Sequence, residues 1–371
     1  MLTRRSILLT PAALSLSAAL ADPAKARDTP AARPHSEMAS LFVSLDRPLI
    51  MVRSAGGIPV PMVFDTGTSG NAAEPIYATS LNLQKTGDVI TIDGATGQPL
   101  GTGGFVTIVP DVSMGGVSVG DQEFSIYPRS STNEIGIVGP YVFGDKLVCL
   151  ELARDRIRVR DKTPFTLPTG PAYPYLDDDR PGILIDGPGF SGLALMDSGA
   201  SGALTLPLDM AASLPLEAPP IITGQATSVS GSRPVYGGRL RGQIRVGPLT
   251  LTNPMLEFSG VRMNVGFNIL NQMMIVIDPV GRRSWASVPG GRPASPLSDY
   301  AGQYGEREIR ADGGLLQFQG AGRPPRRLIP YHDDLFDLEG SEAQIQFVRG
   351  ETGVIGYDII EYTVREFERT G

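Results

Sequence analysis

The sequence predicts an all-β protein in which two similar halves precede a small antiparallel β domain. Three observations support this class: the 45 glycines and 32 prolines follow no period, short strand-like runs alternate with turn residues, and helical periodicity is scarce. The stretches that suggest short helices follow Val142 and Ile269. With 371 residues, the chain has material for two or three domains.

Residues 1–21 have the pattern of an export signal. Arg4 and Arg5 precede a short apolar run, which ends in Ala-Leu-Ala at residues 19–21, typical of a cleavage site. The arginine pair resembles a twin-arginine signal, and an ordinary secretory signal is the alternative. Either reading predicts a bacterial protein that is periplasmic or secreted. We expect residues 22–40 to be a linker and no later segment to span a membrane.

The charge and the rare residue types exclude several classes of function. The net charge of −7 argues against nucleic acid and anionic membranes as partners. Only two histidines, His35 and His332, and one cysteine, Cys149, are present. This excludes a Cys/His metal cluster and a disulfide framework. We therefore expect neither a metal nor a cofactor, and a chemistry that depends on carboxylates, hydroxyls and the backbone.

An internal repeat organises the middle of the chain. The run PMVFDTGTSG at residues 61–70 recurs as LALMDSGASG at residues 193–202, and IGIVG at 135–139 is answered by MNVGF at 263–267. Asp65 lies 73 residues before Val138, and Asp197 lies 68 residues before Val265. Two blocks in the same order at similar spacing predict homologous halves. We place them at residues 41–160 and 176–290, with a proline-rich connector at 161–175.

The C-terminal segment differs in composition. Of residues 300–371, 21 of 72 are charged, against 19% of the whole chain. Alternating runs such as residues 315–318 and 345–348 predict half-exposed strands of an antiparallel sheet. Residues 298–371 are therefore expected to form a separate small β domain after a linker at 289–298.

Asp65 and Asp197 are the candidate catalytic residues. Each ends an apolar strand and precedes a hydroxyl residue and a glycine, which lets backbone amides approach the carboxylate. One such turn is ordinary, but two on duplicated halves indicate carboxylates that meet on a pseudo-two-fold axis. Carboxyls ~3 Å apart share a proton. One can then act as a base toward water and the other as an acid toward a carbonyl.

These residues resemble the aspartic peptidases, and more specifically retropepsin-like bacterial proteins of the pepsin/retropepsin superfamily with two lobes in one chain. The resemblance rests on Asp-Thr-Gly at 65–67, Asp-Ser-Gly at 197–199 and the blocks at 137–139 and 264–266, and it covers about residues 40–290. It implies a cleft between two β lobes and a peptide or protein substrate; we expect a monomer. The residues that would support the dyad are Thr66, Gly67, Thr68, Ser198 and Gly199.

The resemblance also implies two flaps over the cleft, and it has departures. The flap residues would be Gly94, Ala95, Thr96 and Gly97 in the first half and Ser230, Gly231 and Ser232 in the second. Asn264 stands where an apolar residue is usual, and neither flap tip carries the tyrosine of pepsin-like enzymes. Residues 300–304 and 328–330 are similar to the small β domain appended to exported serine hydrolases of the β-lactamase kind.

One asymmetry between the halves leads to a hypothesis about the dyad. Three residues after Asp65 stands Thr68, whereas three after Asp197 stands Ala200. We expect Thr68 to donate to Asp65 and favour its ionised form, which leaves Asp197 to hold the proton.

Two other functions remain open at this point. The first is a peptide-binding protein that keeps the dyad but does not cut. The second is an actin- or sugar-kinase-like ATPase, whose phosphate loops also read Asp-x-Gly-Thr-Ser-Gly, or, more remotely, an aspartyl-phosphate enzyme. Export, few helix signals and the blocks near Val138 and Val265 count against the ATPase.

Overall fold

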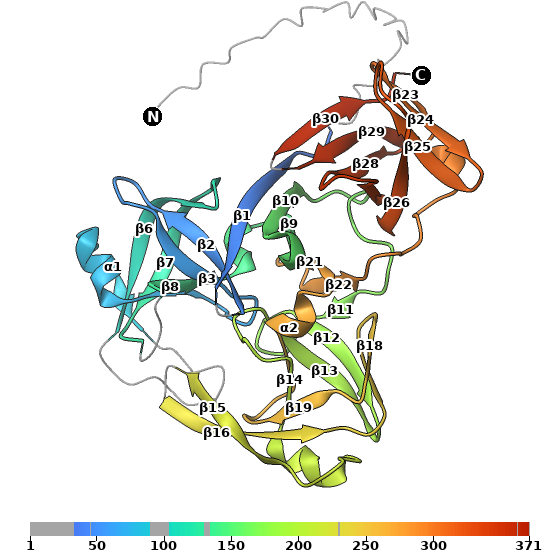
Figure 1. Cartoon of the computed structure of the whole chain (residues 1–371). Helices are drawn as coiled ribbons and strands as arrows, with labels where there is room; N and C mark the ends of the chain where they lie inside the picture. Colours follow the sequence, from blue (N-terminus) through green and yellow to red (C-terminus); the bar gives the residue numbers. More distant parts are fainter. Residues whose placement is uncertain are drawn as a thin grey trace, which may run out of the picture. The chain divides into compact units, whose positions relative to one another are not determined.

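The chain folds into three β-sheets in a computed structural model that describes residues 33–44, 46–89, 104–129, 134–228, 231–361 and 363–370 (Figure 1). Strands hold 54% of the described residues and helices 8%. The all-β fold class is therefore confirmed, and it is consistent with an aspartic-protease-like fold plus an additional β domain. No helix among the described residues has the length and apolarity needed to cross a bilayer.

The first sheet has thirteen strands in the order β11-β22-β21-β9-β10-β1-β2-β3-β8-β4-β7-β6-β5. They are β1 (Ser36–Ser44), β2 (Arg47–Arg53), β3 (Val60–Phe64), β4 (Asn71–Ala73), β5 (Gly87–Asp88), β6 (Phe105–Met114), β7 (Val117–Ile126), β8 (Gly136–Val138), β9 (Lys146–Glu151), β10 (Arg156–Asp161), β11 (Tyr173–Pro174), β21 (Met274–Asp278) and β22 (Arg283–Ser287). Strands β9 and β21 are antiparallel neighbours, with Cys149 opposite Val276. They are the apolar strands that end in an acid in each half, so strands of both halves share this sheet.

The second sheet has nine strands in the order β15-β16-β19-β14-β20-β13-β12-β17-β18. They are β12 (Gly182–Gly187), β13 (Phe190–Asp197), β14 (Leu204–Leu206), β15 (Ile221–Ser228), β16 (Gly231–Arg239), β17 (Gln243–Val246), β18 (Leu249–Thr252), β19 (Met255–Phe258) and β20 (Asn264–Gly266).

The same arrangement of five strands occurs in both sheets. The order β2-β3-β8-β4-β7 of the first corresponds to β12-β13-β20-β14-β19 of the second. In each set the four pairings are in turn antiparallel, parallel, antiparallel and parallel. The repeated sequence blocks occupy equivalent strands, because β3 and β13 lead to the two aspartates while β8 and β20 run beside them.

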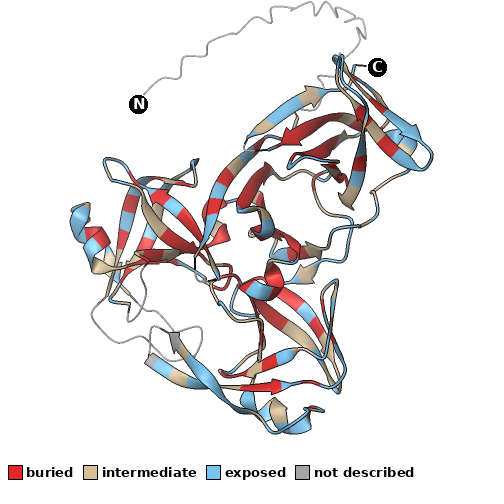
Figure 2. Cartoon of the chain, in the orientation of Figure 1, coloured by how far each residue is buried: buried red, intermediate tan, exposed pale blue. Residues whose placement is uncertain are grey.

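Apolar side chains hold these central strands in place. Phe64 and Met196, each next to an aspartate, are fully buried, as are Val138 and Val265 on the neighbouring strands. Figure 2 shows buried residues gathered along the same strands. Short apolar strands flanked on both faces lose the period-2 pattern, which is why these runs read as continuously apolar in the sequence.

Helices are short, as the sequence predicts. They are α1 (Pro75–Ser80), α2 (Phe267–Leu270) and the 3₁₀ turns η1 (Pro140–Phe143), η2 (Leu152–Arg154), η3 (Leu208–Ser213) and η4 (Leu297–Asp299). Short helices were expected to follow Val142 and Ile269; the 3₁₀ turn η1 and the helix α2 contain these residues and begin before them. Helix α1 was not predicted, since six residues are too few to display a helical period.

The third sheet is a meander in which each strand pairs with the next along the chain. Its strands are β23 (Gly302–Tyr304), β24 (Arg307–Asp312), β25 (Leu315–Gln319), β26 (Arg326–His332), β27 (Leu335–Leu338), β28 (Gln344–Gly350), β29 (Gly353–Ile360) and β30 (Val364–Glu368). After β30, the Thr370 amide donates to the Gln303 carbonyl at 2.8 Å, which brings the chain back to β23. Aromatic rings fill the interior, with Phe347 in contact with Tyr300, Tyr304 and Tyr357.

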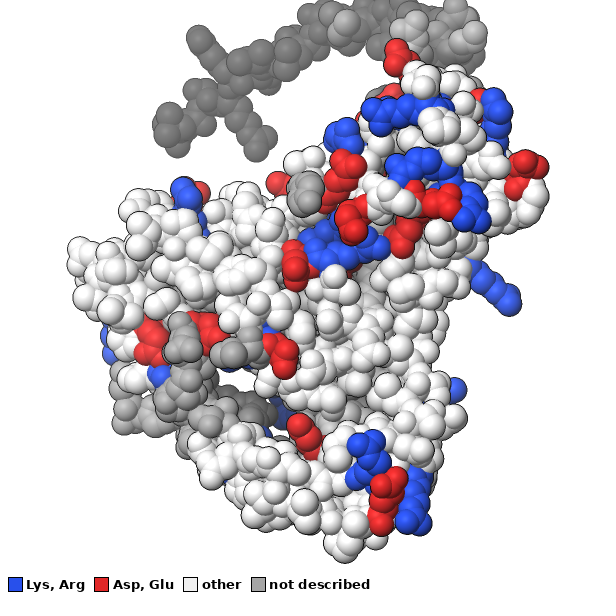
Figure 3. Space-filling view, viewed as in Figure 1, with Lys and Arg blue, Asp and Glu red and all other residues white. Residues whose placement is uncertain are grey.

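Strand β28 is more buried than the expected half-exposed strand. Gln344 and Gln346, on its polar positions, are 0% and 4% exposed. They accept hydrogen bonds from Arg156 and Arg158 of β10, and both arginines also donate to the buried Glu151. A polar face thus packs against the first sheet, a contact that alternation alone does not reveal. Figure 3 shows positive and negative side chains side by side over the third sheet.

Candidate active site

Asp65 and Asp197 lie at the ends of equivalent central strands. Asp65 follows β3, and its amide donates to the Val138 carbonyl at 2.9 Å. Asp197 is the last residue of β13 and lies opposite Gly266 of β20. In each half, a parallel neighbouring strand therefore fixes where the aspartate leaves the sheet.

Two hydroxyl residues tie the aspartate loops together. The Thr66 amide donates to Ser198 Oγ and the Ser198 amide donates to Thr66 Oγ1, both at 3.0 Å. The Thr66 hydroxyl donates to the Met196 carbonyl and the Ser198 hydroxyl to the Phe64 carbonyl, both at 2.7 Å. Both side chains are fully buried. These four reciprocal bonds fix the separation of the two loops.

The glycines after these hydroxyl residues let each loop approach the opposite carboxyl. A Cβ on Gly67 would lie 2.7 Å from Asp197 Cγ, and one on Gly199 would lie 2.6 Å from Asp65 Cγ. Both distances are far below van der Waals contact, so no side chain fits at either position. The Asp-Thr/Ser-Gly pattern is thus explained by the meeting of the two loops.

The two carboxyl groups share one environment but have different partners. Asp65 Oδ1 accepts from the Gly67 amide at 2.6 Å. Asp197 Oδ1 accepts from the Ala200 amide at 3.0 Å, and its Oδ2 accepts from Asn264 Nδ2 at 2.8 Å. Burial, the charge of Asp197 and a hydrogen bond with Asp197 raise the pKa of Asp65 well above its ordinary value; the Gly67 amide and the positive charge of Arg129 oppose this only in part. The close approach of the two carboxyls and their burial therefore favour a proton on the pair.

The expected contact between Thr68 and Asp65 is wrong. The Thr68 hydroxyl donates instead to the Gly70 carbonyl at 2.7 Å, which closes a short turn within its own loop. The pKa of Asp65 is raised by burial and by the charge of Asp197, and Thr68 does not oppose this. A hydroxyl three residues after an aspartate can close a local turn as readily as it can reach the carboxylate.

Arg180 is a site residue that the sequence reasoning missed. Its side chain is buried, and Nη1 donates to the Gly67 carbonyl at 2.8 Å. The second terminal nitrogen of the same guanidinium, Nη2, forms an ion pair with Asp178, which Arg262 also contacts. The sequence signal for Arg180 is a second repeat: an Arg-Pro pair precedes an apolar run at both 47–48 and 180–181. The two arginines nevertheless have different partners, because Arg47 forms an ion pair with Glu134 within its own half.

The expected flaps are described only in part. Gly94, Ala95, Thr96, Gly97 and Ser230 lie outside the described residues. In the second half, β15 and β16 form the expected antiparallel hairpin, with Gly231 opposite Ser228 and Ser232 opposite Thr227. Beside this hairpin, a hollow of about 650 Å³ is lined by apolar side chains that include Leu208, Leu216 and Tyr236.

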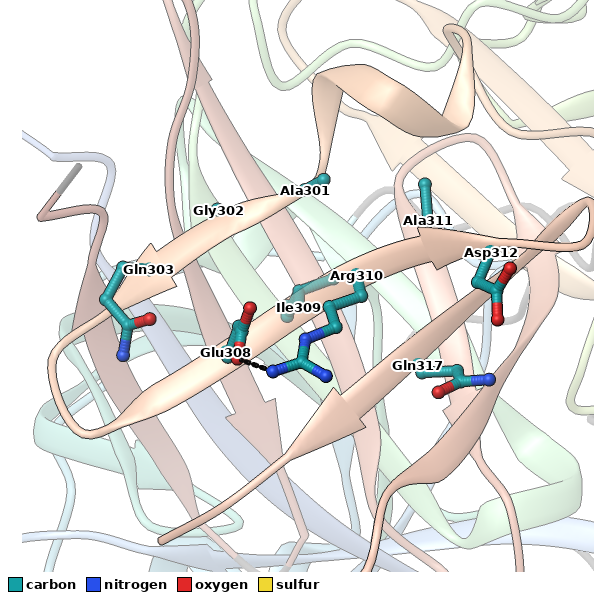
Figure 4. A pocket seen from close by; sticks show the side chains of 9 residues that line it. All are labelled: Ala301, Gly302, Gln303, Glu308, Ile309, Arg310, Ala311, Asp312 and Gln317. Carbon is teal, nitrogen blue, oxygen red and sulfur yellow. Dashed lines mark hydrogen bonds and ion pairs between the residues drawn. The ribbon is translucent and has the colours of Figure 1, made fainter.

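Another hollow, of about 740 Å³, lies on β23, β24 and β25 of the third sheet (Figure 4). Glu308 and Arg310 hydrogen-bond to each other across its floor at 2.6 Å. No residue of the aspartate loops lines it. In the part of the chain that the structure describes, no group of three or more His, Cys, Asp or Glu side chains could hold a metal ion.

Comparison with known families points to the same chemistry as the geometry. Residues 50–140 match the family model for aspartyl proteases. The matched segment contains Asp65, β3, β8 and the strands between them, and it supports a peptidase at the level of the family, with proteins as substrates. Asp197 lies outside it and is linked to this chemistry by the internal repeat. A search of the curated proteins finds no match.

Proposed function

We propose that the chain is an exported aspartic endopeptidase with two lobes, in which Asp65 and Asp197 activate water for the hydrolysis of peptide bonds. The lobes would be residues 41–160 and 176–290, and residues 298–371 would form an additional β domain. The export-signal pattern of residues 1–21 supports a periplasmic or secreted location.

One observation carries this proposal: the reciprocal bonds between Thr66 and Ser198 hold two aspartates from different halves so close that the charge of Asp197 raises the pKa of Asp65. Such a pair exists with one proton over a wide pH range. It therefore presents an acid and a base to the same small space, which ester or amide hydrolysis requires.

The reaction would proceed without a covalent intermediate. The ionised carboxylate takes a proton from water as the water oxygen adds to the peptide carbonyl carbon. The protonated carboxyl gives its proton to the carbonyl oxygen, which produces a tetrahedral diol. The diol then collapses: one hydroxyl returns its proton to a carboxylate, the nitrogen accepts a proton from the other carboxyl, and the C–N bond breaks to release an acid and an amine. The pair ends with one proton, as it began.

The all-β fold does not suit the ATPase alternative. Actin- and sugar-kinase-like folds place helices between strands, whereas helices in the described part of the chain have at most six residues.

The experiment is cleavage of a mixed peptide library by the mature protein between pH 3 and 7.5, with Asp65→Asn and Asp197→Asn as variants and with pepstatin as an inhibitor. The proposal expects cleavage that either substitution or pepstatin abolishes. Cleavage that survives both substitutions would contradict it. Peptide binding without cleavage by the wild type would favour the silent binding protein.

A further inference from the structure

Asn264 and Ile137 occupy equivalent positions in the two halves. In the second half, Asn264 of β20 lies opposite Leu195, two residues before Asp197. In the first half, Ile137 of β8 lies opposite Val63, two residues before Asp65. Each therefore sits one strand away from its aspartate, at the same register. One is an amide that can donate, and the other is a hydrocarbon that cannot.

This difference gives the two carboxyls unequal support. Asn264 Nδ2 donates to Asp197 Oδ2 at 2.8 Å, while the Ala200 amide donates to Oδ1 at 3.0 Å. Both oxygens of Asp197 thus have a donor from its own half. Asp65 Oδ1 accepts a hydrogen bond from the Gly67 amide at 2.6 Å. The hydrocarbon side chain of Ile137 cannot donate a hydrogen bond to the other oxygen of Asp65.

The orientation of the amide is set by Asp197. Asn264 Oδ1 is buried and has no hydrogen-bond partner among the described residues, so the contact through Nδ2 fixes which way the group faces. An ionised carboxylate can only accept hydrogen bonds, whereas a protonated one also donates. A donor held against the carboxylate stabilises the ionised form and lowers its tendency to take a proton.

Other titratable groups also lie near Asp65. Arg129 and Tyr141 interact electrostatically with Asp65, and the positive charge of Arg129 favours ionisation. Arg180 holds the Gly67 carbonyl, but its charge is paired with Asp178. The pKa of Asp65 is nevertheless raised, first by burial and next by the charge of Asp197. Burial and the charge of Asp197 thus outweigh the nearby cation in their effect on the pKa of Asp65.

We propose that Asn264 is a positioning residue that keeps Asp197 ionised, so that Asp197 is the base toward water and Asp65 is the acid toward the substrate carbonyl. This deepens the proposed function and rests on it for the roles of the two aspartates. The order of protonation that it implies does not depend on cleavage and can be measured by itself.

The test follows the two carboxyls by ¹³C NMR of the full mature protein labelled at the aspartate Cγ. Asp65→Asn and Asp197→Asn assign the two signals. In the wild type, the Asp197 signal should move at lower pH than the Asp65 signal. Asn264→Ile, which copies the first half, should raise the Asp197 midpoint by about one pH unit, since a lost hydrogen bond of ordinary strength corresponds to about one pKa unit.

Two further variants serve as controls. Ile137→Val, which keeps the first half apolar, should leave both midpoints unchanged. Ile137→Asn, which gives Asp65 the missing donor, should lower the Asp65 midpoint. Asn264→Ala replaces Asn264→Ile if the larger side chain prevents folding, as judged by thermal unfolding. If the protein cleaves peptides, the acid limb of kcat/KM should move to higher pH in Asn264→Ile by the same amount.

The outcomes separate this inference from the proposed function. An Asp65 signal that moves at lower pH than that of Asp197, or an Asp197 midpoint unaffected by Asn264→Ile, overturns the role of Asn264 even in an active peptidase. A protein that cleaves nothing contradicts the proposed function, while the order of the two titrations still decides the role of Asn264.

Discussion

The guanidinium of Arg180 donates to the carbonyl oxygen of Gly67 at 2.8 Å, although the two residues lie 113 positions apart and in different halves of the repeat. Gly67 also packs against the Asp197 carboxyl. The loop that carries Asp65 is thus held from the second half both through its backbone and through the hydroxyl contacts of Thr66.

Replacing Arg180 by methionine should slow the reaction without unfolding the protein. A hydrogen bond from a charged donor contributes about 1.5–3 kcal/mol, which corresponds to about a 10- to 160-fold loss in kcat if the Gly67 loop shifts. Steady-state kinetics measure this effect. Arg245→Met is the matched control, because Arg245 is an exposed arginine that also pairs with an aspartate, Asp186. Equal kinetics for the two variants would show that Arg180 does not position the loop.

Replacing Thr66 by valine should reduce both stability and activity. The isosteric change removes the hydroxyl that serves the Met196 carbonyl and the Ser198 amide, both of them buried. Leaving buried polar groups unpaired costs about 1–3 kcal/mol each. Urea unfolding should show a loss of this order, and Thr66→Ser should restore most of it. Thr79→Val, which removes an exposed helix hydroxyl, should change little; a similar loss there would refute the explanation.

A methyl group at position 199 should abolish activity. In Gly199→Ala, the new Cβ would lie 2.6 Å from Asp65 Cγ, so the two loops must separate. We expect kcat to fall by at least about 100-fold, because misplacing a catalytic group by about 1 Å can have that effect. Gly70→Ala, in the aspartate loop of the first half, is the control, since no atom lies within 4 Å of the position that its Cβ would take. Retained activity in Gly199→Ala would mean that the loops do not meet in this way.

Replacing Glu151 by glutamine should destabilise the protein in a pH-dependent manner. Burial alone would raise the pKa of Glu151, but Arg158 and Arg156 outweigh it and lower the pKa below its ordinary value of 4.5. The ion pairs therefore stabilise the fold above pH 4.5, and this contribution is lost as the pH falls through the lowered pKa. At pH 7 we expect a loss of about 3–5 kcal/mol, because two buried arginines lose their partner.

Urea unfolding at several pH values measures this effect, and the gap between wild type and Glu151→Gln should narrow below pH 4.5. Glu308→Gln, which removes an exposed pair with Arg310, should leave stability unchanged at each pH. A gap of constant size across the pH range would show that the charge of Glu151 is not what stabilises the contact.

Much of the fold and the pair of candidate aspartates could be predicted because the repeat consists of short motifs that can be recognised in the sequence itself. Apolar runs before Asp65 and Asp197 predict strands, and their duplication predicts that the two turns meet. Contacts that depend on register could not be predicted in the same way. In the sequence, Asn264 is only a departure from the apolar residue that is usual at its position. In the structure, it lies opposite Leu195, and its amide reaches Asp197.

Contacts between segments that are far apart in the chain could not be predicted from the sequence either. The sequence shows Arg180 beside a proline, but only the folded chain brings it to Gly67. Thr68 was misjudged because its hydroxyl has a closer acceptor in its own turn. The alternation in β28 predicts an exposed polar face, whereas Gln344 and Gln346 meet arginines of β10.

The most direct test of the central claim is cleavage of a single peptide bond in ¹⁸O-labelled water under single-turnover conditions. Mass spectrometry then measures the label in the new carboxyl group and in the segments that contain Asp65 and Asp197. Attack by water held between the two aspartates predicts one ¹⁸O atom in the product and none in either aspartate. Label in an aspartate, which would require a covalent anhydride, or the absence of any cleavage would contradict it.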